Sequence, residues 1–142
     1  MQLSRPVDYA LRAMAYLASL PASCGATRST LSRATGVPEP FLAKVMRRLV
    51  VARLVVAHRG VGGGFKLAEP PAQISLLRVV QAVDGPESIR SCFLSAKPCS
   101  ARHPCRVHDA LANVRVELAQ ALANTFVSDL PRHSGGGSLP AI

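Results

Sequence analysis

The chain has 142 residues, enough for one domain or for a compact domain with one extended arm. Hydrophobic residues make up 49% of it and aromatic residues 4%, which argues against disorder and favours helices packed on helices. Asp8 and Arg12 interrupt the apolar stretch at the N-terminus, so no membrane span or secretory signal is predicted and the protein is expected in the cytoplasm.

The net charge of +9 is concentrated in the first half of the chain. Residues 1–66 hold ten Lys and Arg residues against two acidic residues, Asp8 and Glu39, whereas the remainder is close to neutral. A basic patch is the electrostatic footprint of phosphate binding, so this distribution favours a nucleic-acid partner. Charge alone does not separate DNA from RNA or from an acidic membrane surface.

The first predicted helix begins near Ser4, which can cap it, and runs to about Leu20 with apolar residues at helical spacing. After a break at residues 21–25, Ser29 or Thr30 can cap a short helix, and Gly36 supplies a tight turn. A second helix then opens at Glu39. Two short helices joined by a Gly-containing turn predict a helix-turn-helix.

The second of these helices has an inward and an outward face. The inward positions are Phe41, Leu42, Val45, Met46 and Leu49. The outward face is expected in the major groove, with its first residues nearest base edges and its later Arg pair near phosphates. The residues assigned to DNA contact on these two helices are Arg28, Glu39, Pro40, Ala43, Lys44, Arg47 and Arg48.

Two short strand-like runs follow, at residues 54–59 and 65–67, with a glycine-rich turn between them. Such a hairpin directly after a helix-turn-helix predicts a wing, in which Arg59, Gly60, Gly62 and Gly63 approach DNA closely. A nucleotide phosphate loop is rejected because no Lys-Ser/Thr pair and no helix follow the glycines. The predicted fold is therefore mainly α, a winged helix-turn-helix with a small β-hairpin.

The second half predicts a helix over residues 74–83 capped by Ser75, a loop over 87–104, and a last helix over 105–130. The last helix is too long for this core to bury alone, so it is expected to pair with its copy in a homodimer. We divide the chain into a DNA-binding region (1–70), a sensing and dimerisation region (71–131) and a tail (132–142).

Three cysteines lie at Cys92, Cys99 and Cys105, with His108 three residues after the last. In a cytosolic chain such a cluster predicts metal or redox chemistry. A zinc site using His108, an iron–sulfur cluster and a metal-free thiol switch are all compatible with the spacing. Cys24 lies far from this group and is expected to be a small buried apolar residue.

The Arg59-Gly60-x-Gly62-Gly63-Gly64-Phe65 hairpin, the preceding helix-turn-helix and the cysteine triad resemble the Rrf2-type bacterial regulators, the family of IscR, NsrR and RirA. The resemblance covers roughly residues 1–130. It implies a winged-helix dimer on pseudo-palindromic operator DNA, with a [2Fe–2S] or [4Fe–4S] cluster on Cys92, Cys99 and Cys105. For the fourth ligand the resemblance offers His108 or Asp8 of the partner subunit.

The function expected from this resemblance is a transcriptional regulator that senses iron, iron–sulfur status, redox state or nitric oxide. No nucleophile–base pair appears in the sequence, so no catalytic residue is predicted. A protein-interaction adaptor is disfavoured by the wing, and a redox enzyme by the lack of a Cys-x-x-Cys pair. A regulator that uses thiols alone or zinc stays open.

Overall fold

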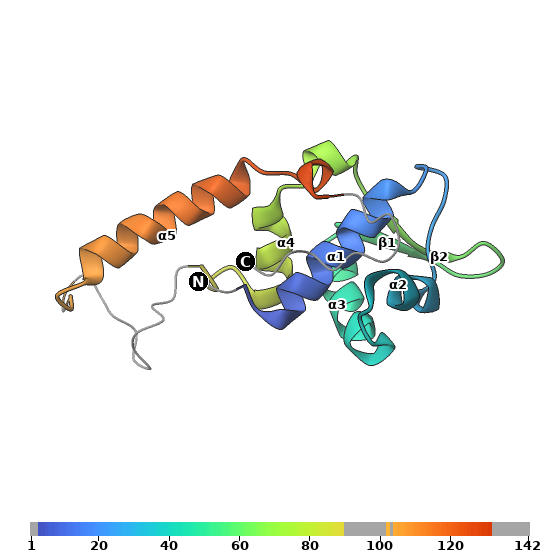
Figure 1. Ribbon diagram of the computed structural model, residues 1–142, viewed down its shortest axis with the longest axis horizontal. Coiled ribbons are helices and arrows are strands. Elements are labelled where there is room, and N and C mark those ends of the chain that lie inside the picture. Colours follow the sequence, from blue (N-terminus) through green and yellow to red (C-terminus); the bar gives the residue numbers. More distant parts are fainter. Residues whose placement is uncertain (1–2, 90–101, 103, 132–142) are drawn as a thin grey trace.

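Helix α1 spans Arg5–Ser19 and passes through the middle of the molecule (Figure 1). The computed structural model describes residues 3–89, 102 and 104–131. Ser4 caps α1, because its hydroxyl accepts a hydrogen bond from the Val7 N–H at 3.3 Å, and Pro6 occupies the first turn. The cap predicted from the sequence is confirmed.

Helices α2 (Arg28–Thr35) and α3 (Glu39–Val51) form the helix-turn-helix. Gly36 ends α2 in the left-handed conformation, with φ at 70°, and the Ser32 hydroxyl donates to the Val37 carbonyl at 2.7 Å across the turn. The cap of α2 is Thr27, which accepts from the Thr30 N–H at 3.1 Å. The expected caps, Ser29 and Thr30, are wrong because both residues already lie inside the helix.

The wing is an antiparallel hairpin of β1 (Val55–His58) and β2 (Gly64–Leu67). Val55 lies opposite Leu67, and His58 lies opposite Gly64 at the open end. The chain between α1 and α2 joins this sheet, because Ala26 and Phe65 exchange two backbone hydrogen bonds of 3.0 and 2.8 Å. The wing is thereby attached to the entry of α2.

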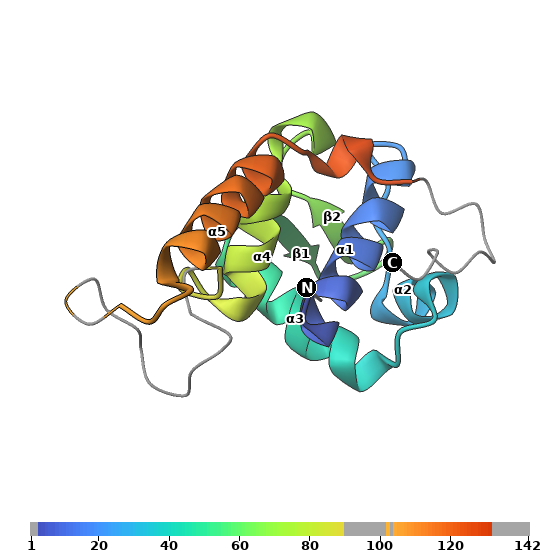
Figure 2. The same cartoon turned by 60° about the vertical axis from the view of Figure 1, so that its left-hand side comes forward.

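Helices α1, α3 and α4 (Leu76–Asp84) pack against one another, as their arrangement in Figure 2 shows, and the hydrophobic core lies between them. Ser75 caps α4 as predicted, accepting from the Arg78 N–H at 3.4 Å. Burying these side chains stabilises the fold by roughly 1.5–3 kcal/mol each. The largest fully buried side chains are Met14, Leu31, Leu42, Met46, Leu49, Leu54 and Ile74.

Phe41 does not belong to this core, contrary to the sequence prediction. Its side chain is 51% exposed, whereas Leu42 is fully buried beside it. The buried stripe of α3 is Leu42, Val45, Met46 and Leu49, and Phe41 lies one residue off that stripe. Its ring instead packs on Tyr9 of α1, with the ring centroids 5.8 Å apart.

The last helix, α5, spans His108–Ala123 and is shorter than the predicted 105–130. It ends because the chain becomes extended at Phe126 and returns to the start of α4. Leu76 N–H donates to the Thr125 carbonyl at 2.8 Å, and Val127 N–H donates to the Ile74 carbonyl at 2.9 Å. Two 3₁₀ turns, Pro71–Gln73 and Val127–Asp129, pack together at this junction.

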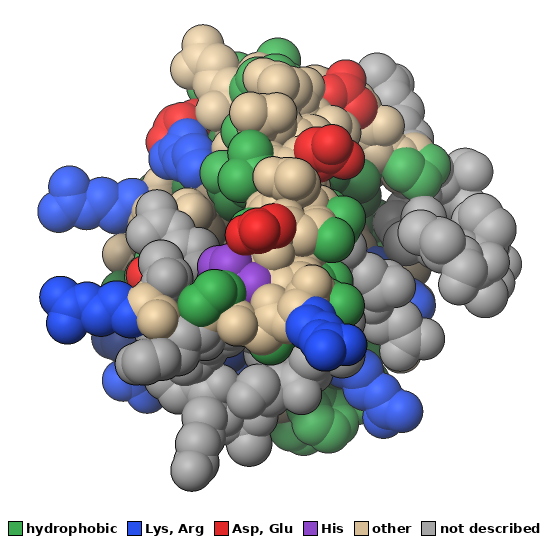
Figure 3. Space-filling model, turned by 90° about the vertical axis from the view of Figure 1, so that its left-hand side faces the viewer, with side chains coloured by type: hydrophobic (Ala, Val, Ile, Leu, Met, Phe, Trp, Pro, Cys, Tyr) green, Lys and Arg blue, Asp and Glu red, His purple; other side chains and the backbone are tan. Residues whose placement is uncertain are grey.

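The N-terminal end of α5 projects away from the rest of the molecule (Figures 1 and 2). Leu122 is the one α5 residue that is buried in the core, and Leu118 is partly buried against it. Val114 and Val116 are 44% and 55% exposed. Figure 3, which faces this side, shows hydrophobic side chains at the surface among polar and acidic ones.

Candidate nucleic-acid interface and cysteine segment

One face of α3 is open to solvent along its length. Pro40, Lys44 and Arg47 are exposed, and Glu39 and Ala43 are partly exposed. Positions three and four apart lie on one side of a helix, so these residues form a single ridge. The structure therefore brings together the residues that the sequence assigned to base and phosphate contact on this helix. Arg48 is exposed as well, but it also contacts another helix.

Arg48 reaches from α3 to α4. Its guanidinium donates to the Val83 carbonyl, in the last turn of α4. A carbonyl in the last turn of a helix lacks an intrahelical donor, and a cation there also interacts favourably with the helix dipole. Arg48, Lys44 and Arg47 line a shallow cavity of about 420 Å³ floored by Val51, Ala52 and Ala82.

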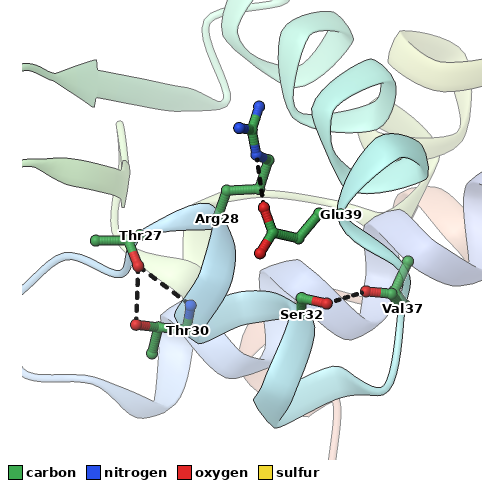
Figure 4. Close-up of polar contacts among 6 residues, drawn as sticks. All are labelled: Thr27, Arg28, Thr30, Ser32, Val37 and Glu39. Carbon is green, nitrogen blue, oxygen red and sulfur yellow. Dashed lines mark hydrogen bonds and ion pairs between the residues drawn. The ribbon is translucent and has the colours of Figure 1, made fainter.

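Arg28, at the start of α2, forms an ion pair with Glu39, at the start of α3 (Figure 4). Arg28 Nε lies 3.3 Å from Glu39 Oε2, and the two side chains are 53% and 45% exposed. The contact joins the N-terminal turns of the two helices of the motif. The sequence assigned Arg28 and Glu39 to DNA contact separately. No sequence pattern indicated that these two residues pair with each other.

The wing turn is built from glycines that other residues would not replace easily. Gly60 and Gly62 have φ values of 98° and 73°, in the region that favours glycine. A Cβ at Gly63 would lie 2.6 Å from the His58 carbonyl oxygen, closer than real contacts allow. Val61 at the tip is fully exposed, and Arg59 is exposed beside it. The predicted wing contacts thus lie on an accessible turn.

Lys66 has a structural role that no sequence pattern indicated. Its ammonium donates to the Ser23 carbonyl at 2.6 Å and so ties β2 to the loop after α1. The only sequence signal was a cation next to Phe65 in a wing strand. It could not reveal the contact, because Ser23 lies 43 residues away in the sequence. Cys24 in the same loop is exposed, so the expectation of a buried cysteine is wrong.

We call residues 87–108 the cysteine segment. Cys92 and Cys99 lie outside the described residues, so their grouping with Cys105 stays a prediction. Cys105 is an exposed free thiol, and the His108 N–H donates to its backbone carbonyl at 3.0 Å at the start of α5. Asp8 pairs with Arg12 on α1 at 3.0 Å. Among the described residues, no three metal-ligating side chains come together.

A groove of about 450 Å³ separates α4 from α5. Leu77, Ile89 and Val116 contribute apolar walls, and Gln81 and Gln120 contribute polar ones. Within the part of the chain that the structure describes, no helix is long and apolar enough to cross a membrane.

Residues 3–133 match the family model Rrf2, described as iron-dependent transcriptional regulators. The chain belongs to the Rrf2 family of transcriptional regulators. A Mycobacterium tuberculosis H37Rv protein provisionally named an HTH-type transcriptional regulator is 33% identical over 141 residues, which cover 99% of this chain and 84% of that one. The family and this relative are described as transcriptional regulators and not as enzymes.

Solved structures share the fold. The global cysteine regulator CymR of B. subtilis superposes with a TM-score of 0.75 at 21% identity, covering 91% of this chain and 95% of that one. IscR of T. potens superposes with a TM-score of 0.71 at 20% identity, covering 91% and 85%. The winged helix-turn-helix expected for a member of the Rrf2 family is confirmed.

Proposed function

We propose that this Rrf2 member is a cytoplasmic homodimer whose affinity for a pseudo-palindromic operator is set by an iron–sulfur cluster held by Cys92, Cys99 and Cys105. The observation that carries DNA binding is the joint exposure of the basic α3 ridge and the glycine wing. Lys44, Arg47 and Arg59 are all exposed there. Salt-dependent phosphate contact is what such cations provide. Residues 1–70 would read DNA and residues 71–131 would sense and dimerise.

Dimerisation is supported by the exposed apolar side chains of α5. Val114 and Val116 lie on a helix that packs on its own chain mainly through Leu118 and Leu122. The α4–α5 groove next to Val116 offers a concave surface for a second copy of α5. A two-fold dimer presents two α3 helices, so its operator would carry two inverted half-sites.

Cluster binding is supported by the donor set at the start of α5. Cys105 is exposed, His108 lies one turn further on, and Arg102 and Arg106 are exposed beside them. Neighbouring cations offset the negative charge of a thiolate-bound cluster. A bound cluster would supply sensitivity to oxidants, iron supply or nitric oxide. The fourth ligand would be His108 or Asp8 of the partner subunit.

A structural change in the cysteine segment would reach the DNA-binding helix α3 through α4. The cysteine segment follows α4 after Gly85 and Pro86, and Arg48 of α3 holds the last turn of α4 through the Val83 carbonyl. A shift of that turn would therefore reach the helix that carries Lys44 and Arg47. This relay gives the cysteine segment a covalent and hydrogen-bonded path to the DNA-reading ridge.

A cluster-free thiol switch is the second candidate, because Cys105 and Cys24 are both exposed. One of the fold neighbours is CymR of Staphylococcus aureus in an oxidized form, with a TM-score of 0.71 at 20% identity over 89% of this chain and 93% of that one. Zinc on the three cysteines and His108 is the remaining alternative.

An anaerobic absorbance spectrum, with iron and sulfide counted per chain, tests the cluster. We expect visible bands and both elements in the parent and in Cys24→Ala, and their loss in Cys99→Ala. A parent that stays colourless after reconstitution would overturn cluster binding. Zinc in that protein would favour the zinc site, and absence of metal would favour the thiol switch.

A further inference from the structure

Glu39 is an acidic residue in the most basic part of the chain. Residues 1–66 hold ten cations and two acids. The other acid, Asp8, pairs with Arg12 on α1. Glu39 instead lies in the first turn of α3, at the end of the exposed ridge that carries Lys44 and Arg47. A carboxylate at this place is repelled by phosphates, so it lowers the affinity for DNA unless a base compensates for it.

The Arg28–Glu39 pair leaves hydrogen-bonding capacity unused on both partners. Arg28 engages Glu39 Oε2 through Nε alone, at 3.3 Å. Within the described chain, no other residue bonds to its two terminal nitrogens or to Glu39 Oε1. Figure 4 shows Arg28 of α2 turning its Nε toward the carboxylate of Glu39 of α3, while the terminal nitrogens of Arg28 point away from that carboxylate. A carboxylate held in this way has a restricted orientation and one free acceptor.

Building on the proposed DNA binding, we propose that Glu39 is a specificity residue that accepts a hydrogen bond from the N4 amino group of a cytosine in each half-site, and that Arg28 positions it. Cytosine presents a major-groove amino donor, and acidic side chains accept from it. Guanine and thymine present acceptors at the corresponding place and would repel the carboxylate. The terminal nitrogens of Arg28 are left to donate to a neighbouring backbone phosphate.

A purely structural role for Glu39 makes a different prediction. An acid in the first turn of a helix stabilises it through the helix dipole, and α3 has no side-chain cap of its own. That role would lower the melting temperature of a Glu39 variant and leave its base preference unchanged. Base preference and thermal stability therefore separate the two roles.

The test is in vitro selection of bound duplexes from a randomised DNA pool by the full-length dimer. The wild-type protein should enrich a C·G pair at one symmetric position per half-site, disfavouring other pairs there by at least about fivefold. Glu39→Ala should lose that preference at this position alone. Glu39→Gln should shift it toward adenine, the base that a glutamine side chain pairs with. Arg28→Ala should weaken the preference and lower affinity for every sequence.

The matched control is Glu117→Gln, which removes the same charge from an exposed position on α5. It should keep the wild-type preference. A Glu39→Ala or Glu39→Gln protein that melts like the parent and enriches the same sequences would overturn the specificity role while leaving DNA binding intact. A wild-type protein that enriches no sequence would overturn the proposed function together with this inference.

Discussion

The guanidinium of Arg48 on α3 donates to the main-chain carbonyl of Val83 on α4, across 35 positions of sequence. This contact joins α3, the proposed DNA-reading helix, to the helix that precedes the cysteine segment. Arg47, the next residue along the chain, is exposed on the open ridge. Two adjacent arginines are thus expected to have different functions.

Arg48→Met should lower the free energy of unfolding by about 1–2 kcal/mol, because it removes a charge-assisted hydrogen bond to a helix end. Arg47→Met should leave stability nearly unchanged. It should instead reduce the slope of log K against log salt by about 0.9 for each phosphate that Arg47 neutralises. Urea unfolding and salt-dependent anisotropy measure the two effects. An Arg48→Met protein that melts like the parent but has a reduced salt slope would assign Arg48 to phosphate contact.

Gly64→Ala should destabilise the wing. Its φ is 136°, and an added Cβ would lie 2.5 Å from the Ala26 carbonyl oxygen, so a destabilisation of about 2–3 kcal/mol is expected with weaker operator binding. Gly62→Ala is the control, because its φ of 73° is strained but nothing lies within 4 Å of the added Cβ. Its cost should stay near about 1 kcal/mol. Equal melting temperatures for the two variants would contradict the close approach of Ala26.

Acid should weaken the contact between Glu69, in the segment that follows β2, and Arg78 of α4. Glu69 and Arg78 pair through two hydrogen bonds of 2.7 and 2.8 Å, and the hydrogen bond from Arg78 lowers the pKa of Glu69 below its ordinary value near 4.5. A carboxyl group whose pKa is lowered in the folded protein stabilises the fold at pH values above its ordinary pKa. That stabilisation is lost as the pH falls through the lowered pKa. Arg78 also reaches the Gln73 carbonyl at 3.3 Å.

Glu69→Gln should therefore unfold more easily than the parent at neutral pH, and the difference should shrink below about pH 4. Glu117→Gln, at an exposed position on α5, should show no such convergence. Thermal melting from pH 7 to about pH 3 makes the comparison. A gap between parent and Glu69→Gln that is constant over this range would show that the ion pair does not lower the pKa.

Val116→Asp should dissociate the proposed dimer. Val116 lines the α4–α5 groove, and burying an unpaired carboxylate there would raise the dimer dissociation constant by about 100-fold. The same substitution at Val61, on the fully exposed wing tip, should leave the dimer intact. Sedimentation equilibrium distinguishes them. A Val116→Asp protein that remains dimeric would place the interface on another surface.

Local features of the fold were predictable because local chemistry decides them. Ser4 and Ser75 cap helices, Gly36 ends α2, and the glycine-rich turn forms a hairpin, as the sequence indicated. The left-handed conformation of Arg53 was not predictable. Its φ is 58° at the end of α3, a position where glycine is usual. The Leu54 N–H bonds back to the Leu49 carbonyl at 3.0 Å and closes that helix end.

Contacts between distant segments were not predictable. The extended return at Phe126 that shortens α5 depends on pairing with Ser75, and the Arg28–Glu39 pair depends on the packing of α2 against α3. The exposed ridge of α3 could be found because its helix periodicity is visible in the sequence. Whether the three cysteines come together depends on the tertiary structure. Cys92 and Cys99 lie outside the described residues, so that part of the site stays a prediction.

The most direct test of cluster control is the affinity of the anaerobically purified protein for its selected operator before and after chemical removal of the cluster. We predict at least about a fivefold change in affinity for the parent and for Cys24→Ala, the size of a modest allosteric coupling. Cys99→Ala should have a single affinity that the same treatment does not change. Equal operator affinities for the cluster-bearing and cluster-free parent would contradict control of DNA binding by a cluster on Cys92, Cys99 and Cys105.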